Sequence, residues 1–168
     1  MAVQKTQILN DTQVKQILKR IAYQVYENNF NEKELIIGGI DGNGFLVAQM
    51  LHEQLSAISK LKLSLIKISL NKKEPSEKNL ILSDEKLILK DKNILLVDDV
   101  LNTGRTMIYA LLPFIKAHSK KIHTMVLVDR DHKSFPVNAD FIGTSLSTTL
   151  QEHVTVTIEK KKVNVYLS

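Results

Sequence analysis

Hydrophobic residues recur with a helical period in three stretches of the chain. They are spaced three and four positions apart across residues 14–25, 46–58 and 107–115. This spacing predicts three helices, each with one apolar face that is most simply a packing face. Asn10 and Asp11 precede the first stretch, and either side chain can cap a helix that ends near residue 28.

Shorter apolar runs outside the helical stretches predict strands. The run 94–97 is unbroken and the run 122–128 is mostly apolar, as expected for strands buried on both faces. The polar stretch 71–79 contains a proline and is expected to be an exposed, mobile loop. The other expected strands begin at 35–37, cover 63–70, form a small hairpin from 80–82 and 87–89, and form a second hairpin around a turn at 159–162.

The strand predicted at 94–97 leads directly into polar residues that can bind a sugar phosphate. Asp98 and Asp99 follow it, and the turn Asn102–Thr106 precedes the third helical pattern. Acids at the carboxyl end of a parallel strand lie where open α/β sheets bind ligands. The turn offers backbone N–H groups, two hydroxyls and a helix start, which together can cradle a phosphate. The alternative, two surface acids beside a helix cap, requires both features to coincide by accident.

Residues 38–44 form a second unit of strand, glycine-rich turn and helix. Glycines let the backbone approach a bound anion, so this turn is a candidate for an anion-binding loop. The order of its glycines is not that of the dinucleotide-binding fingerprint, and a tight structural turn explains it equally well. A third polar cluster, Asp129–Lys133, follows the strand predicted at 122–128.

Composition limits the class of protein. The 168 residues are about one domain's worth, and they are 43% hydrophobic and 24% charged, as in ordinary globular proteins. The absence of cysteine excludes disulfides and thiolate chemistry. No apolar run has the length of a membrane span or of a signal-peptide core, so we expect a cytoplasmic protein without a membrane partner. The net charge of +5 suits phosphorylated substrates and RNA alike.

The stretch from Ile94 to Thr106 resembles the signature of the type I phosphoribosyltransferases, which use phosphoribosyl pyrophosphate (PRPP). The resemblance implies one α/β domain over residues 1–168, in which helices flank a central, mostly parallel sheet with a small hood and a flexible hairpin loop. It also implies that Asp98 and Asp99 are catalytic, meet the ribose hydroxyls, and contact Mg²⁺ only indirectly through Mg–PRPP. The residues it assigns to the 5-phosphate are Asn102, Thr103, Gly104, Arg105 and Thr106, and those it assigns to pyrophosphate are Ile40, Asp41, Gly42, Asn43 and Gly44.

Three segments resemble the PyrR proteins in particular, which regulate pyrimidine operons and often act as uracil phosphoribosyltransferases. They read ILNDTQVKQILKRIAYQVYENN, VDDVLNTGRT and LVDRDHKSFPVNADFIG. The resemblance implies that Arg130, Phe141 and Ile142 contact the base. Arg130 has an alternative as a structural partner of Asp98 or Asp140.

The resemblance also implies that the loop at 71–79 closes over PRPP. Lys72 and Lys73 in this loop would then touch pyrophosphate. Solvated lysines on a hairpin are an equally good interpretation of each.

Three residues depart from the patterns of the relatives. Asp41 and Asn43 occupy a loop in which many relatives carry a lysine or arginine. Asn102 stands where purine enzymes generally have an aspartate that acts as a base, and where PyrR proteins commonly have a tyrosine. An amide cannot accept a proton as a base, so Asn102 argues against a purine enzyme. Together these residues leave the efficiency of catalysis open.

The main expectation is therefore a PRPP-dependent uracil phosphoribosyltransferase that uses Mg²⁺, releases pyrophosphate and forms a homodimer or homotetramer. One alternative is a nucleotide-sensing, RNA-binding regulator of pyrimidine genes with weak or no catalysis. The other is a purine-salvage phosphoribosyltransferase. RNA binding requires a basic face, and the candidates for it are Lys15, Lys19, Arg20, Lys120, Lys121 and Lys133.

Overall fold

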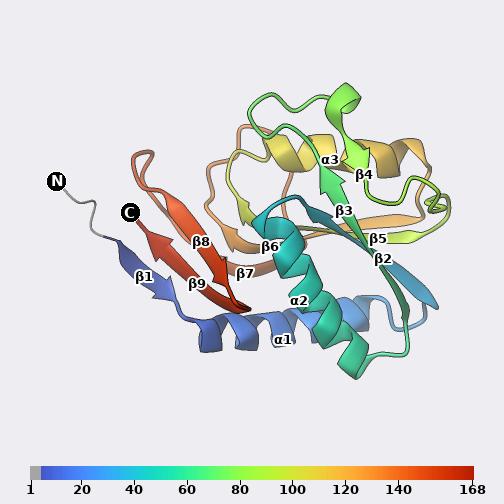
Figure 1. The fold of residues 1–168 in the computed structure, drawn as a ribbon, viewed down its shortest axis with the longest axis horizontal. Helices are drawn as coiled ribbons and strands as arrows, with labels where there is room; N and C mark the ends of the chain where they lie inside the picture. The colour runs from blue at the N-terminus through green and yellow to red at the C-terminus, as the bar shows by residue number, and fades with distance from the viewer. Residues whose placement is uncertain (1–4) are drawn as a thin grey trace.

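The computed structural model describes residues 5–168, so the first four residues of the expected domain lie outside the described part (Figure 1). The secondary structure alternates between strands and helices through most of the chain. The elements are β1 (Thr6–Leu9), α1 (Asp11–Asn28), β2 (Glu34–Ile40), α2 (Asn43–Ile58), β3 (Lys62–Ser69), a 3-10 turn (Glu77–Asn79), β4 (Ile81–Leu82), β5 (Asn93–Leu101), α3 (Arg105–Lys116), β6 (Lys121–Asp129), β7 (Phe141–Ser145), β8 (Val154–Glu159) and β9 (Lys162–Leu167).

The main sheet has six strands in the order β4-β3-β2-β5-β6-β7. β3, β2, β5, β6 and β7 run parallel, and only the short edge strand β4 is antiparallel. In Figure 1, α1 and α2 lie on one side of this sheet and α3 lies on the other. The expected α/β fold with a mostly parallel sheet is therefore confirmed.

The central strand β5 is buried on both faces because helices cover both. Leu95 and Val97 belong to the apolar core that includes α1 and α2, whereas Ile94 and Leu96 belong to the core that includes α3. All four side chains are at most 1% exposed. Their continuous hydrophobicity follows from this double burial, since successive strand residues point to opposite faces.

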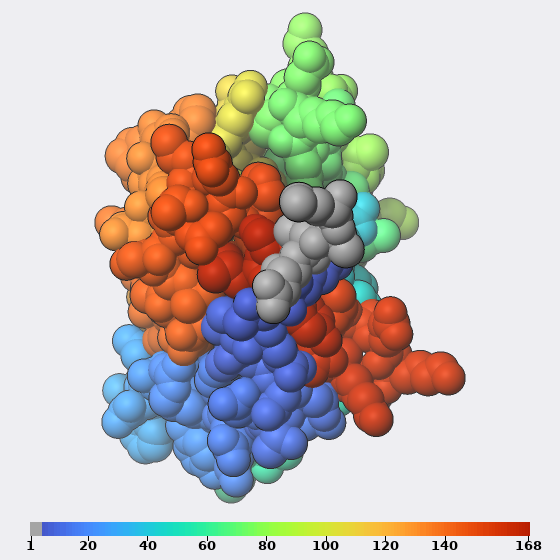
Figure 2. All heavy atoms as spheres, turned by 90° about the vertical axis from the view of Figure 1, so that its left-hand side faces the viewer, coloured from blue at the N-terminus to red at the C-terminus, as the bar shows by residue number. Residues whose placement is uncertain are grey.

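A second, three-stranded antiparallel sheet in the order β1-β9-β8 forms the hood. Lys160 and Lys161 both have positive φ, 49° and 65°, and make the tight turn between β8 and β9 that the sequence predicted. Figure 2 shows the red tip of this hairpin projecting from the body of the molecule. The Asn43 side chain donates a hydrogen bond of 2.8 Å to the carbonyl oxygen of Val156, which ties the start of α2 to the hood.

The prediction that residues 80–82 and 87–89 form a hairpin is wrong. Ile81 and Leu82 instead pair with Ser69 and Ile68, so the hairpin is formed by β3 and β4 around residues 70–80. Residues 87–89 form no strand. Their leucines pack with Leu82 against the α3 core, which removes them from water without strand pairing.

Helix α1 begins with a capping box at Asn10. The backbone N–H of Gln13 donates to Asn10 Oδ1 at 3.0 Å, and the backbone N–H of Asn10 donates to Gln13 Oε1 at 2.9 Å. Asp11, the other predicted cap, accepts a 3.0 Å hydrogen bond from the backbone of Val163 in the hood. Of the helices between residues 5 and 168, none combines the length and hydrophobicity needed to cross a bilayer.

We expect Asn10→Ala to lower the free energy of unfolding by about 1 kcal/mol, because the first-turn N–H group would lose its acceptor. Urea unfolding of the variant measures the change. The matched control is Gln16→Ala, at an exposed position of the same helix, which should change stability by less than about 0.5 kcal/mol. Equal effects of the two substitutions would contradict the cap.

Candidate active site

Two adjacent carboxylates lie at the carboxyl end of β5. Asp98 is 5% exposed, and its Oδ1 accepts a 2.9 Å hydrogen bond from the backbone N–H of Asp99. Asp99 is partly exposed. Burial raises the pKa of Asp98 well above its usual value of 3.8, and the neighbouring charge of Asp99 raises this pKa further.

The start of α2 packs directly on Asp98. A Cβ atom at Gly44 would lie 2.5 Å from Asp98 Oδ1 and 3.1 Å from its Cα, so no larger residue fits there without a shift. The predicted pyrophosphate loop and the predicted ribose-binding acids are therefore in contact.

The predicted 5-phosphate loop surrounds a hollow of about 220 Å³ at the end of β5. Gly104 has φ of 84°, a left-handed conformation that glycine adopts readily, and α3 begins at the next residue. The carbonyl oxygen of Thr103 accepts hydrogen bonds from the N–H groups of Ser134 and Phe135, at 2.9 and 3.1 Å. The hollow is lined by Lys72, Asp98, Val100, Leu101, Asn102, Thr103, Gly104, Arg105, Thr106 and Met107.

Asp41 and Asn43, which depart from the pattern of the relatives, connect the predicted pyrophosphate loop to neighbouring elements. Asp41 Oδ1 accepts a 2.8 Å hydrogen bond from the N–H of Gly42 and lies 3.7 Å from Lys67 Nζ. Asp41 Oδ2 lies 3.4 Å from the hydroxyl of Ser69 on β3. Asn43 is bound to the hood. Both side chains thus have structural partners, while Ile40 is fully buried.

Of the two predicted loop lysines, the structure brings one into the hollow. Lys72 lines it together with Asp98, and Lys72 Nζ is 3.9 Å from the position a Cβ on Gly42 would occupy. Lys73 is exposed and does not line this hollow. In Figure 2 the green β3–β4 loop lies beside the yellow start of α3, in agreement with this lining.

A second hollow, of about 480 Å³, adjoins the first because Asn102 and Thr103 line both. Its other walls come from the end of β6 and from the segment that joins β7 to β8. They are Arg130, Asp131, His132, Lys133, Ser134, Leu150 and His153. Sequence patterns gave no signal for Leu150 or His153, because the segment that carries them has no periodicity.

That Phe141 and Ile142 contact the base stays a prediction, and the structure shows what surrounds the two residues. Phe141 starts β7, is 6% exposed, and packs edge-on against His123 with ring centroids 5.5 Å apart. It pairs with Met125, four residues before β6 ends at Asp129. Through β6, Phe141 lies level with Val97 of β5 and Ile142 lies level with Asp98, two strands away. The carbonyl oxygen of Ile142 accepts a 3.1 Å hydrogen bond from the Arg20 guanidinium.

Arg130 is buried, and neither of its predicted ionic partners binds it. Its guanidinium donates to Thr148 Oγ1 and to the carbonyl oxygens of Thr149 and Glu152. Asp140 instead accepts a 2.8 Å hydrogen bond from the backbone of Thr124. Arg130 lines the second hollow while its polar atoms serve the β7–β8 connection.

Comparison with known proteins agrees with this geometry. The model of the phosphoribosyl transferase domain matches residues 4–159. A hypoxanthine phosphoribosyltransferase of Trypanosoma cruzi superposes with a TM-score of 0.77 over 95% of both chains, at 14% identity, which shows a shared fold. Fold, acidic strand end and phosphate-type loop together define a phosphoribosyltransferase.

Curated relatives narrow this class. The bifunctional protein PyrR of Streptococcus thermophilus is 32% identical over 97% of this chain and 98% of its own length. That of Clostridium acetobutylicum is 33% identical over 96% and 97%. The chain belongs to the phosphoribosyltransferase family, in its PyrR branch, as the resemblance in the sequence indicated.

We expect Asp98→Asn to stabilise the protein at neutral pH. The folded state holds the Asp98 proton to higher pH than the unfolded state does, because its pKa is raised. The contribution of Asp98 to stability is therefore full below pH 3.8 and decreases as pH rises toward the raised pKa. Asparagine does not titrate, so this decrease should disappear.

Urea unfolding of both proteins between pH 4 and 8 measures the effect. The difference in free energy of unfolding, variant minus parent, should grow with pH. A constant difference over this range would contradict a raised pKa at Asp98.

Proposed function

We propose that this protein transfers the phosphoribosyl group of PRPP to a nucleobase, preferably uracil, and releases pyrophosphate. The observation that carries the proposal is the shared hollow of Asp98 and the loop Asn102–Thr106. A carboxylate pair next to a helix start suits a ligand that has both vicinal hydroxyls and a phosphate. PRPP has both groups.

The parts of the site have distinct roles in this proposal. The N–H groups and hydroxyls of Thr103–Thr106 bind the 5-phosphate, and the Arg105 guanidinium offsets its charge. Asp99 accepts hydrogen bonds from the ribose hydroxyls. Asp98 orients the Asp99 backbone through the hydrogen bond between them. The glycine-rich turn 40–44 offers backbone N–H groups to the pyrophosphate.

The reaction forms a bond from a base nitrogen to the anomeric carbon and breaks the bond from that carbon to pyrophosphate. Positive charge develops on the sugar ring as the leaving group departs. The carboxylates of Asp98 and Asp99 stabilise this charge electrostatically. The remaining task of the protein is to align the two reactants and exclude water.

Magnesium fits this site only together with the substrate. Mg²⁺ takes about six oxygen ligands, and within residues 5–168 no three His, Cys, Asp or Glu side chains gather to hold a metal. Asp98 and Asp99 would therefore contact the ion through the ribose and pyrophosphate oxygens or water. When bound, Mg²⁺ neutralises charge on the pyrophosphate leaving group.

Lys72 supplies the positive charge that the turn 40–44 lacks. We expect Lys72→Gln to raise KM for PRPP about tenfold, because a charge-assisted hydrogen bond contributes about 1.5–3 kcal/mol. Steady-state kinetics at saturating base measures the change. Lys73→Gln is the matched control, and its KM should stay within about twofold of the parent. Equal effects of the two variants would show a general charge effect instead.

The base is proposed to occupy the second hollow, which adjoins the phosphate loop. The preference for uracil is supported by the PyrR relatives and by Asn102, whose amide cannot act as a base toward a purine nitrogen. The hypoxanthine-enzyme neighbours share the fold at 14–16% identity and do not indicate a substrate.

Pyrophosphate release from PRPP and Mg²⁺, with uracil, hypoxanthine, guanine and xanthine offered separately, tests the assignment. We expect release with uracil alone. Release only with a purine would overturn the assignment of uracil as the substrate. No release with any base, from protein shown to bind PRPP, would overturn the transfer and favour the regulatory alternative.

RNA binding has less support, because five of its six candidate residues have partners within the chain. Lys15 and Lys120 form ion pairs with Asp11 and Glu32, and Lys133 pairs with Asp129. Arg20 and Lys121 donate to backbone carbonyl oxygens. Within the described part of the chain, Lys19 alone of the six shows no such partner. Filter binding at increasing salt tests this alternative, since phosphate contacts weaken steeply with salt.

A further inference from the structure

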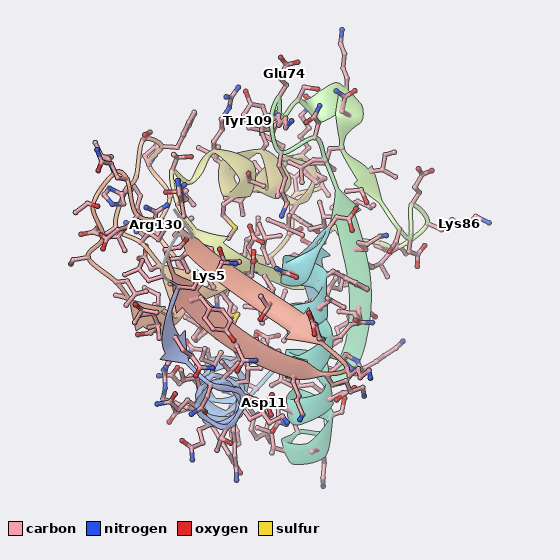
Figure 3. The ribbon with its side chains drawn as sticks, turned by 60° about the vertical axis from the view of Figure 1, so that its left-hand side comes forward. Lys5, Asp11, Glu74, Lys86, Tyr109 and Arg130 are labelled. Atoms are coloured by element: carbon pink, nitrogen blue, oxygen red, sulfur yellow. The ribbon has the colours of Figure 1, made fainter. Side chains whose placement is uncertain are left out.

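Arg130 is a buried arginine whose donors serve backbone and hydroxyl groups. It is 6% exposed and follows β6 directly. Its Nε donates to Thr148 Oγ1 at 3.2 Å, and its Nη2 donates to the carbonyl oxygens of Glu152 at 2.5 Å and Thr149 at 3.4 Å. Figure 3 shows Arg130 beside the loops at the end of the main sheet. An arginine is rarely buried unless its donors are satisfied, so these contacts define its position.

His132 holds the same segment from a second point. Its Nε2 lies 2.6 Å from the carbonyl oxygen of Thr148 and 3.0 Å from Thr148 Oγ1. A carbonyl oxygen only accepts, so Nε2 carries the proton. A third contact joins the N–H of Leu146 to the carbonyl oxygen of Asp129 at 2.8 Å.

These contacts fix residues 146–153, which we name the strap. The strap contains no helix or strand, so its own backbone ladder cannot hold it. It closes on itself through a 2.6 Å hydrogen bond from the N–H of Thr149 to Glu152 Oε2. The strap is therefore attached to the main sheet through residues at the end of β6. Arg130 donates three of these hydrogen bonds.

The strap forms one wall of the second hollow, and the phosphate loop forms another. Leu150, 84% exposed, and His153 come from the strap, whereas Asn102 and Thr103 come from the phosphate loop. The position of the strap thus sets the width of the space next to the sugar-phosphate site. An exposed leucine at the rim of a polar hollow is suited to cover the apolar face of a planar ring.

We propose that Arg130 is a positioning residue that holds the strap, and with it Leu150, at the distance that a nucleobase requires. This rests on the proposed function and adds the residue that controls base binding. Arg130 acts through Thr148, Thr149 and Glu152 and touches no reacting atom. Lysine cannot replace it, because a single ammonium group does not reproduce the fork of a guanidinium.

Arg130 should affect binding of the base but not binding of the sugar phosphate. The phosphate loop is held by Ser134 and Phe135 and the acids by Gly44, and none of these contacts involves the strap. Loss of the Arg130 contacts should therefore weaken binding of a nucleoside monophosphate and leave PRPP binding unchanged.

Calorimetric titration of the full chain with uridine monophosphate, inosine monophosphate and PRPP tests this. We expect Arg130→Lys to raise Kd for the monophosphate that the parent binds at least about tenfold, with Kd for PRPP within about twofold. Thr148→Val removes the hydroxyl that both Arg130 and His132 contact and should raise the same Kd about threefold or more. Ser147→Ala, at an exposed strap position, is the control and should bind like the parent.

An equal rise in Kd for PRPP and monophosphate, or unchanged monophosphate binding in both variants, would overturn the proposal. A parent that binds neither monophosphate would overturn it as well. If Arg130→Lys does not fold, as judged by urea unfolding, the comparison of Thr148→Val with Ser147→Ala decides. These titrations require no turnover, so failure of pyrophosphate release in the parent would overturn the transfer reaction separately.

Discussion

The burial of Asp98 at the end of β5 is the constraint on which the site depends. Its carboxylate is almost completely removed from water, receives the N–H of Asp99 and packs against Gly44. One side chain therefore joins the central strand to the start of α2. A buried acid with a raised pKa costs stability near neutral pH.

Each loop around this point is braced by a neighbouring element. Asp41 connects the glycine-rich turn to β3, and Asn43 connects it to the hood. Thr103 receives two N–H groups from residues 134 and 135, and Arg130 holds the strap. Groups that are already fixed lose less conformational freedom on binding, so these contacts lower the entropic cost of binding a ligand to the loops. The unusual acid and amide at 41 and 43 are explained as structural contacts.

Most of the basic residues discussed above also serve as contacts between elements, and one lies at the candidate site. The chain carries a net charge of +5, but several of its basic groups are used to join elements, such as Arg20 at the edge strand β7 and Lys120 at Glu32. Lys72, on the β3–β4 loop, lies instead beside the buried acid. The positive charge of Arg20 and Lys120 is therefore used within the fold, and that of Lys72 lies beside the candidate site.

The sequence by itself determined the elements whose evidence is local. The period of hydrophobic residues specifies α1 and α3, and the run Ile94–Val97 followed by two acids and a glycine turn specifies the strand end and its loop. These features depend on neighbours a few positions apart, so they can be read along the chain. The tertiary structure alone decided which remote groups meet. Arg130 binds residues 18 to 22 positions away, β4 pairs with β3, and Phe141 packs against His123 of the neighbouring strand β6. Such partners are set by strand order and direction, which local periodicity does not encode.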